Sequence, residues 1–132
     1  AQLAVFGDQK DREKLVSDLE SILYIYQQVP FHTQVVGIYH VLIVTNYLLG
    51  SYQKTEELYR RFKRTTKDKV VSTEDALLIT AFFYASKWQE TKRTQYAQKL
   101  NLVRTEAQKE GLTAILKTLE TLSLNIQVPV KR

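Results

Sequence analysis

Apolar residues recur three and four positions apart along most of the chain, which is the spacing of amphipathic helices. The pattern predicts six helices separated by polar or glycine-containing joints. Their expected ranges are about 10–27, 33–49, 52–65, 73–85, 89–109 and 113–124. Only two Pro and four Gly occur among 132 residues, so an all-α fold of antiparallel helices is expected.

Two of the predicted helices carry almost no polar face. One contains the runs 41–44 and 47–49, and the other contains the runs 76–79 and 81–85. A helix that is apolar on all sides is expected at the centre of a fold. The helices between and around them are amphipathic and are expected to cover the two central ones.

The first and third predicted helices show one apolar face each. On the first helix this face is formed by Leu15, Leu19, Ile22, Leu23 and Tyr26. On the third helix it is formed by Thr55, Leu58, Tyr59 and Phe62. On the opposite face of the third helix, Glu56 and Glu57 are expected to pair with Arg60 and Arg61, four residues further on.

A short sequence near residue 50 returns 36 residues later. Gly50-Ser51-Tyr52-Gln53-Lys54-Thr55 is echoed by Ser86-Lys87-Trp88-Gln89-Glu90-Thr91. Both copies follow an apolar segment and open a more polar one, so each is expected to join the two helices of a hairpin. A period near 36 predicts stacked helix pairs.

The joints resemble those of tetratricopeptide repeats, a family of 34-residue helical hairpins with a small residue and an aromatic residue at the turn. Gly50 and Tyr52 stand at that turn in the first copy, and Ser86 and Trp88 in the second. The resemblance covers about residues 16–91. It departs from the family in its 36-residue spacing and in the lack of a closing Pro after either full repeat.

The resemblance implies a concave face that binds a partner. Carried over, the residues lining it are His40, Val44, Tyr47 and Leu48, then Ala76, Leu77, Thr80, Phe83 and Tyr84. Such a groove is apolar and aromatic, which suits an amphipathic helix or an extended apolar peptide. The alternative is that these side chains are core residues covered by other helices.

The charge balance adds a second candidate surface. The chain has 19 Lys and Arg against 14 Asp and Glu, a net charge of +5. The densest basic run contains Arg60, Arg61, Lys63 and Arg64. One interpretation is contact with the phosphate backbone of a nucleic acid. The other is a solvated helix face neutralised by nearby carboxylates.

Nothing in the sequence points to catalysis, a cofactor or a metal. There is no Cys, no Gly-rich phosphate loop and no Ser in a nucleophile elbow. His32 and His40 are the two histidines, and on one helix they are about 12 Å apart, too far to share a metal. We therefore expect neither an enzyme nor a cofactor-binding protein.

The last predicted helix carries a narrow, heptad-like apolar seam. Its members are Leu112, Ile115, Leu116, Leu119 and Leu122. Two interpretations stay open, since the seam could dock within the chain or pair with a second copy to form a dimer.

The length of the chain fits a single helical domain over residues 1–132, with residues 125–132 as an extended tail. The lack of Met leaves open that the chain is a fragment of a longer protein. No apolar run approaches the roughly 18 residues of a membrane span, and no signal peptide is recognisable. A cytoplasmic protein is expected, with an exported mature protein as the alternative.

The sequence thus predicts stacked helical hairpins or a compact helical bundle that binds a protein or peptide without catalysis, as an adaptor, scaffold or regulatory module. The alternatives are a basic bundle that binds nucleic acid and a small inhibitor or immunity-type protein. Neither the partner nor the pathway follows from the residues.

Overall fold

The computed structural model of the chain describes residues 9–26 and 34–126, and every regular element within them is a helix, which confirms the all-α prediction. The helices are α2 (Gln9–Tyr26), α3 (Gln34–Leu48), α4 (Tyr52–Thr65), α5 (Thr73–Thr91), α6 (Thr94–Lys109) and α7 (Thr113–Ile126). The chain forms two compact units, residues 1–71 and residues 72–132. We call them the first and second unit. The single domain expected over the whole chain stays a prediction.

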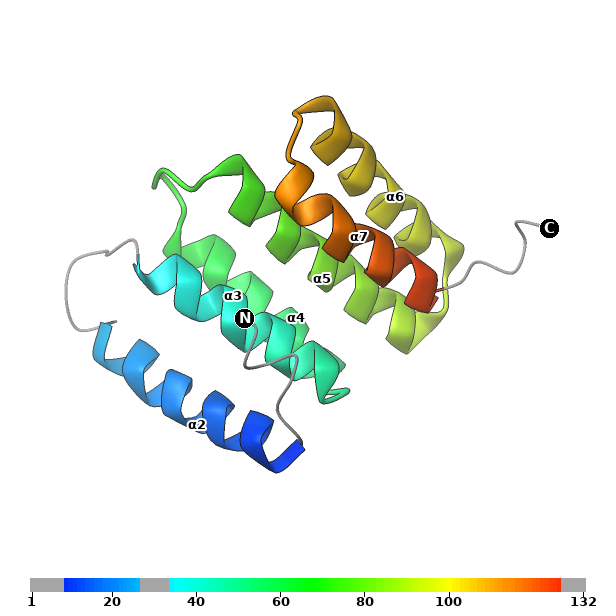
Figure 1. The fold of residues 1–132 in the computed structure, drawn as a ribbon. Helices are drawn as coiled ribbons and strands as arrows, with labels where there is room; N and C mark the ends of the chain where they lie inside the picture. Colours follow the sequence, from blue (N-terminus) through cyan, green and yellow to red (C-terminus); the bar gives the residue numbers. More distant parts are fainter. Residues whose placement is uncertain (1–8, 27–33, 127–132) are drawn as a thin grey trace. The chain divides into compact units, whose positions relative to one another are not determined.

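The first unit is built around α3, which packs against α2 and α4 (Figure 1). Tyr39, Leu42 and Ile43 are fully buried, as expected for a helix that is apolar on all sides. The Tyr39 ring meets the edge of the Phe62 ring at 5.8 Å, and its hydroxyl is hydrogen-bonded to the Thr65 hydroxyl at 3.3 Å. Helix α4 is therefore fixed to α3 by both packing and a polar contact.

The joint predicted at residue 50 is confirmed. Gly50 adopts a φ of +78°, and its N–H donates to the Tyr47 carbonyl at 3.0 Å. The N–H of Ser51 donates to the Asn46 carbonyl at 2.9 Å. These two bonds form a Schellman motif, which satisfies the last carbonyls of α3. Tyr52 then packs its ring against Tyr47, with the ring centroids 5.5 Å apart.

The joint predicted at residue 86 is wrong. Helix α5 continues through Ser86–Thr91, and the turn comes afterwards, where Lys92 adopts a left-handed φ of 56°. The copy at 86 has Ser where the first copy has Gly50, so it lacks the residue that most readily takes a positive φ. Neither Gly nor Pro interrupts residues 86–91, and Ser86 is fully buried. Trp88 consequently lies within α5 and not at the turn.

The second unit consists of α5, α6 and α7, each antiparallel to the next (Figure 1). Helix α5 begins at the N-cap Ser72, whose hydroxyl accepts a hydrogen bond from the Asp75 N–H at 3.1 Å and donates one to the Asp75 carboxylate at 2.8 Å. Helix α6 buries Leu100, Val103 and Ala107 at helical spacing.

Helix α7 packs against both α5 and α6. Three members of the predicted seam, Ile115, Leu119 and Leu122, are buried in this position. The helix extends to Ile126, so the first two residues of the predicted tail are helical, and residues 127–132 lie outside the described part. Among the helices of the described ranges, none is both long enough and apolar enough to cross a membrane.

Candidate interaction surfaces

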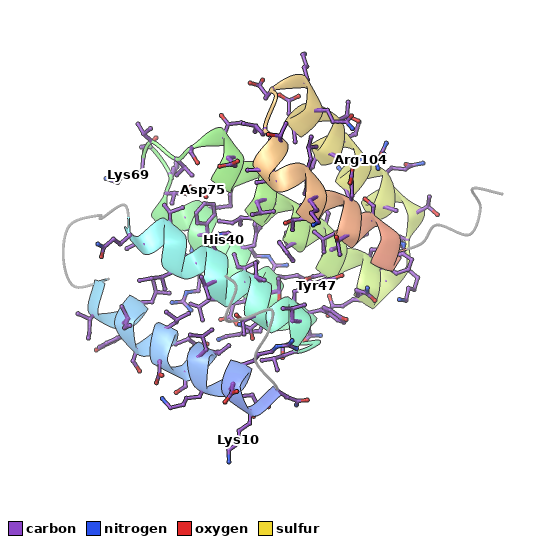
Figure 2. All side chains as sticks on the ribbon, viewed as in Figure 1. Lys10, His40, Tyr47, Lys69, Asp75 and Arg104 are labelled. Carbon is purple, nitrogen blue, oxygen red and sulfur yellow. The ribbon has the colours of Figure 1, made fainter. Side chains whose placement is uncertain are left out.

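The residues predicted to line a groove differ in exposure. On α3, Val44 and Tyr47 are buried, His40 is half-buried and Leu48 reaches the surface; His40 and Tyr47 are labelled in Figure 2. The Tyr47 ring lies against the Tyr52 ring of α4. Val44 and Tyr47 are therefore core residues of the first unit, as the alternative to a groove proposed.

The groove residues predicted on α5 are less buried. Thr80, Phe83 and Tyr84 are each half-buried, as are Ala76 and Leu77. The Phe83 and Tyr84 rings lie 5.5 Å apart. These residues belong to the second unit and those on α3 to the first, so a groove that both sets share stays a prediction.

The basic run lies along α4 and is largely exposed. Arg60, Lys63 and Arg64 are exposed, and Arg61 is half-buried. Lys63 and Arg64 occupy the last turn, where positive charge favours the helix dipole. The aromatic Phe62 between them is buried against α3, so it is a core residue and offers no surface for stacking bases.

One carboxylate of α4 is not where the sequence pattern placed it. Glu56 was expected on the solvated face, but the residue is only 5% exposed. Its expected pair with Arg60 is present, with 3.6 Å between the Glu56 Oε1 and Arg60 Nη2 atoms. Glu57 pairs with Lys54 at 3.8 Å, one turn before it, in place of the expected contact with Arg61.

Large apolar side chains are exposed near the end of α2. Tyr24 and Ile25 are 66% and 63% exposed, and Ile22 is 41% exposed. The sequence pattern placed Ile22 on the buried stripe and did not single out the other two. The signal that identifies them is the unbroken apolar run from Ile22 to Tyr26. Five successive helical residues point in all directions, so one packed face cannot bury them all.

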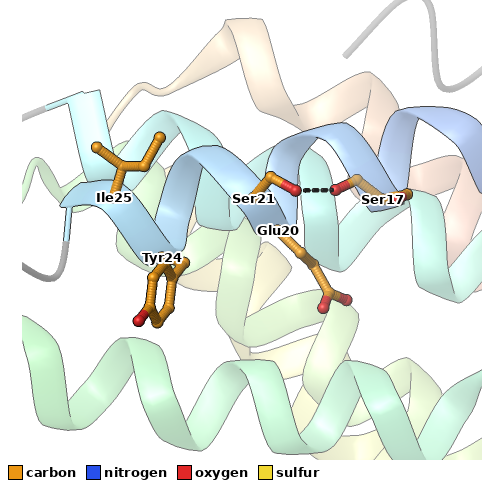
Figure 3. Close-up of a pocket in the computed structure, with 5 residues that line it drawn as sticks. All are labelled: Ser17, Glu20, Ser21, Tyr24 and Ile25. Carbon is orange, nitrogen blue, oxygen red and sulfur yellow. Dashed lines mark hydrogen bonds between the residues drawn. The ribbon is translucent and has the colours of Figure 1, made fainter.

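An open depression of about 540 Å³ adjoins this apolar end (Figure 3). The residues of α2 that line it are Ser17, Glu20, Ser21, Tyr24 and Ile25. The Ser21 hydroxyl donates to the Ser17 carbonyl at 3.2 Å, and the Glu20 carboxylate lies 3.6 Å from the Lys54 ammonium of α4. Because a helix rises about 1.5 Å per residue, the depression changes from polar to apolar over roughly 12 Å. We call Ile22, Tyr24, Ile25 and this depression the α2 patch.

Two observations bear on titratable groups and metal ligands in the described residues. The hydrogen bond that Lys14 donates to Asp18, at 2.9 Å, raises the pKa of the lysine above its ordinary value. This shift stabilises a charge that lysine already carries at neutral pH. Within residues 9–26 and 34–126, no three His, Asp or Glu side chains cluster in a way that could hold a metal ion.

Comparisons of the chain with models of known protein families, with curated proteins and with solved structures found no match.

Proposed function

We propose that this chain is a non-catalytic module that binds a protein or peptide, and that it does so through the α2 patch. The observation that supports the proposal is the exposure of Tyr24 and Ile25 beside a depression with polar residues at its other end. Contiguous apolar surface with a polar border is typical of interaction sites. Tyrosine is enriched in such sites because it offers a large apolar ring and a hydroxyl.

The shape and polarity of the α2 patch suit an amphipathic helix as the occupant. The apolar end would take one or two large side chains of the partner, while the hydroxyls of Ser17 and Ser21 lie where polar groups of the same helix would pass. Recognition of this kind depends on a few apolar anchors spaced along one helix face. The resemblance of the joint at Gly50 and Tyr52 to that of tetratricopeptide repeats is compatible with the same class of function.

A peptide selection tests the proposal. Random 16-residue peptides would be displayed and selected on the wild-type protein, and the affinity of the selected peptides measured by fluorescence anisotropy. The double variant Tyr24→Ser/Ile25→Ser should bind at least about tenfold more weakly, because burying each large apolar side chain is worth about 1.5–3 kcal/mol. Leu102→Ser is the matched control, since Leu102 of α6 is 65% exposed.

Two results would contradict the proposal. One is the failure to select any peptide on the wild-type protein. The other is equal binding to the wild type and to Tyr24→Ser/Ile25→Ser, which would place the contact elsewhere on the molecule. Circular dichroism of each variant shows that it is folded before its affinity is interpreted.

Nucleic-acid binding is the second candidate, and the exposure of Arg60, Lys63 and Arg64 on α4 is the observation that favours it. Because Phe62 is buried, such binding would use phosphate contacts without base stacking. Its affinity should then fall steeply with added salt. Binding of a labelled oligonucleotide that disappears in Lys63→Gln/Arg64→Gln, two exposed positions of α4, would support this candidate, and a salt-independent affinity would reject it.

A further inference from the structure

Three lysines of the second unit lie over aromatic rings at the contact between α5 and α6. The Lys92 ammonium is 4.1 Å from the centroid of the Trp88 ring. The Lys87 ammonium is 5.7 Å from the Tyr96 ring, and the Lys99 ammonium is 5.8 Å from the Tyr84 ring. We call these six residues the lysine–aromatic strip.

The strip follows the direction of the helix pair. Tyr84, Lys87 and Trp88 share one face of α5, being three and four residues apart, and Tyr96 and Lys99 are three residues apart on α6. Because α5 and α6 are antiparallel, the three contacts succeed one another from the turn at Lys92 back along both helices. Neighbouring contacts are separated by about one helical turn, or roughly 5.4 Å.

The rings hold positive charge in place at the surface. A lysine ammonium is attracted to the face of an aromatic ring, and this attraction limits the motion of a long, flexible side chain. Lys92 also donates to the Gln89 side-chain carbonyl at 3.2 Å. An ordered cation loses less entropy when it binds a ligand than a freely moving one does.

The segment that contains the lysine–aromatic strip has an excess of positive charge. Residues 84–99 contain four cations and a single carboxylate, Glu90. Three of these cations, Lys92, Arg93 and Lys99, are exposed. An ammonium group has three N–H donors, so a lysine held against a ring can still donate to an incoming carboxylate.

We propose that the lysine–aromatic strip binds a carboxylate-rich segment of a partner protein. Excess positive charge at spacings of about one helical turn is complementary to a run of Glu or Asp side chains. Single-stranded nucleic acid is the less suitable polyanion, because it requires ring faces on which bases stack, and here ammonium groups lie over the faces of Tyr84, Trp88 and Tyr96. The strip is separate from the α2 patch and does not depend on it.

The test measures binding of a fluorescein-labelled octaglutamate peptide by anisotropy at low ionic strength. The wild-type protein should bind it, and added NaCl should weaken the binding. Lys92→Gln/Lys99→Gln should weaken the affinity about fivefold or more, as expected from the loss of two ordered surface ion pairs. Lys109→Gln/Lys117→Gln is the matched control: it removes the same two charges from exposed positions of α6 and α7 and should change the affinity less than about twofold.

A third variant tests whether the aromatic rings contribute to binding by holding the lysines in place, beyond the effect of the positive charge. Tyr96→Leu keeps every charge and most of the apolar bulk but removes the ring beneath Lys87, so it should also weaken binding of the peptide. Tyr24→Ser/Ile25→Ser should bind octaglutamate as the wild type does, which keeps this result distinct from the outcome at the α2 patch.

Three results would overturn the inference. The first is no binding of octaglutamate by the wild-type protein. The second is an equal loss in the two double-lysine variants, which would show attraction to net charge alone. The third is tighter binding of an oligodeoxythymidine of equal charge that is lost in Tyr96→Leu, which would identify the strip as a base-stacking surface. Thermal melts monitored by circular dichroism show that each variant is folded.

Discussion

Helices α3, α5 and α6 are each followed within three residues by a residue in the left-handed conformation. Gly50 and Gly111 adopt it with φ values of +78° and +72°. Lys92 does so with a φ of 56°, although a side chain makes this conformation about 1–2 kcal/mol less favourable. The turn at Gly50 was predicted from the sequence, and the turn at Lys92 was not, because no residue type marks it.

A pair of glycine substitutions tests this argument. Gly50→Ala should lower the free energy of unfolding by about 1 kcal/mol, because a Cβ there meets nothing within 4 Å and only the positive φ opposes it. Gly37→Ala should raise it by about 0.5–1 kcal/mol, because Gly37 lies within α3 with equally open space around it. Urea denaturation followed by circular dichroism measures both, and shifts of the same sign would contradict the explanation.

Two other residues show where the sequence pattern is insufficient. Glu56 is charged and was predicted on the exposed face of α4, yet it is buried; Ile22 is apolar and was predicted on the buried face of α2, yet it is exposed. Helical spacing determines which residues share a face. It does not determine how far neighbouring helices extend over that face, because that depends on contacts between segments distant in the sequence.

At the scale of the helices, the pattern predicted most ends to within one or two residues. The range 52–65 was predicted as the structure has it, because Gly50 precedes it and a polar, positively charged turn closes it. The exception is the division of α5 at residue 86. That prediction relied on the similarity of residues 86–91 to the first joint. The helix propensity of Ser86–Thr91 indicated otherwise, because the segment contains no residue that ends a helix.

Ser72 precedes α5 and Ser51 precedes α4, and substituting each serine tests whether a side-chain cap stabilises the start of α5. Ser72→Ala should destabilise the protein by about 1 kcal/mol, because the Ser72 hydroxyl accepts a hydrogen bond from the Asp75 N–H. Ser51→Ala should cost much less, because the Ser51 side chain makes no capping bond at the start of α4. The comparison requires only urea midpoints of the two variants, and equal losses would mean that the cap does not explain the start of α5.

At the scale of the whole molecule, the sequence identified candidate surfaces less well than it identified helices. The groove prediction combined residues of α3 and α5, which belong to different units, and included the buried Val44 and Tyr47. The α2 patch was overlooked. A sequence pattern can state that a side chain is apolar, but its exposure depends on the packing of the whole unit.

A substitution in the apolar seam of α7 tests whether the seam packs within the unit or forms a dimer. Leu119 is fully buried in the second unit, so Leu119→Ala should cost about 2–5 kcal/mol of stability. If the seam serves packing within the unit, light scattering should give the same mass for the variant and the wild type at every concentration at which both are folded. A wild-type dimer that Leu119→Ala converts to a monomer would instead support the second interpretation of the seam, pairing between two copies.

The position of the single tryptophan gives each unit its own optical signal. Trp88 lies in the second unit, whereas six of the eight tyrosines lie in residues 1–71. Tryptophan emission therefore reports unfolding of the second unit, while tyrosine difference absorbance reports mainly the first. Coincident transitions would show one cooperative unit of folding. Separate transitions would assign a stability to each half of the chain without cutting it.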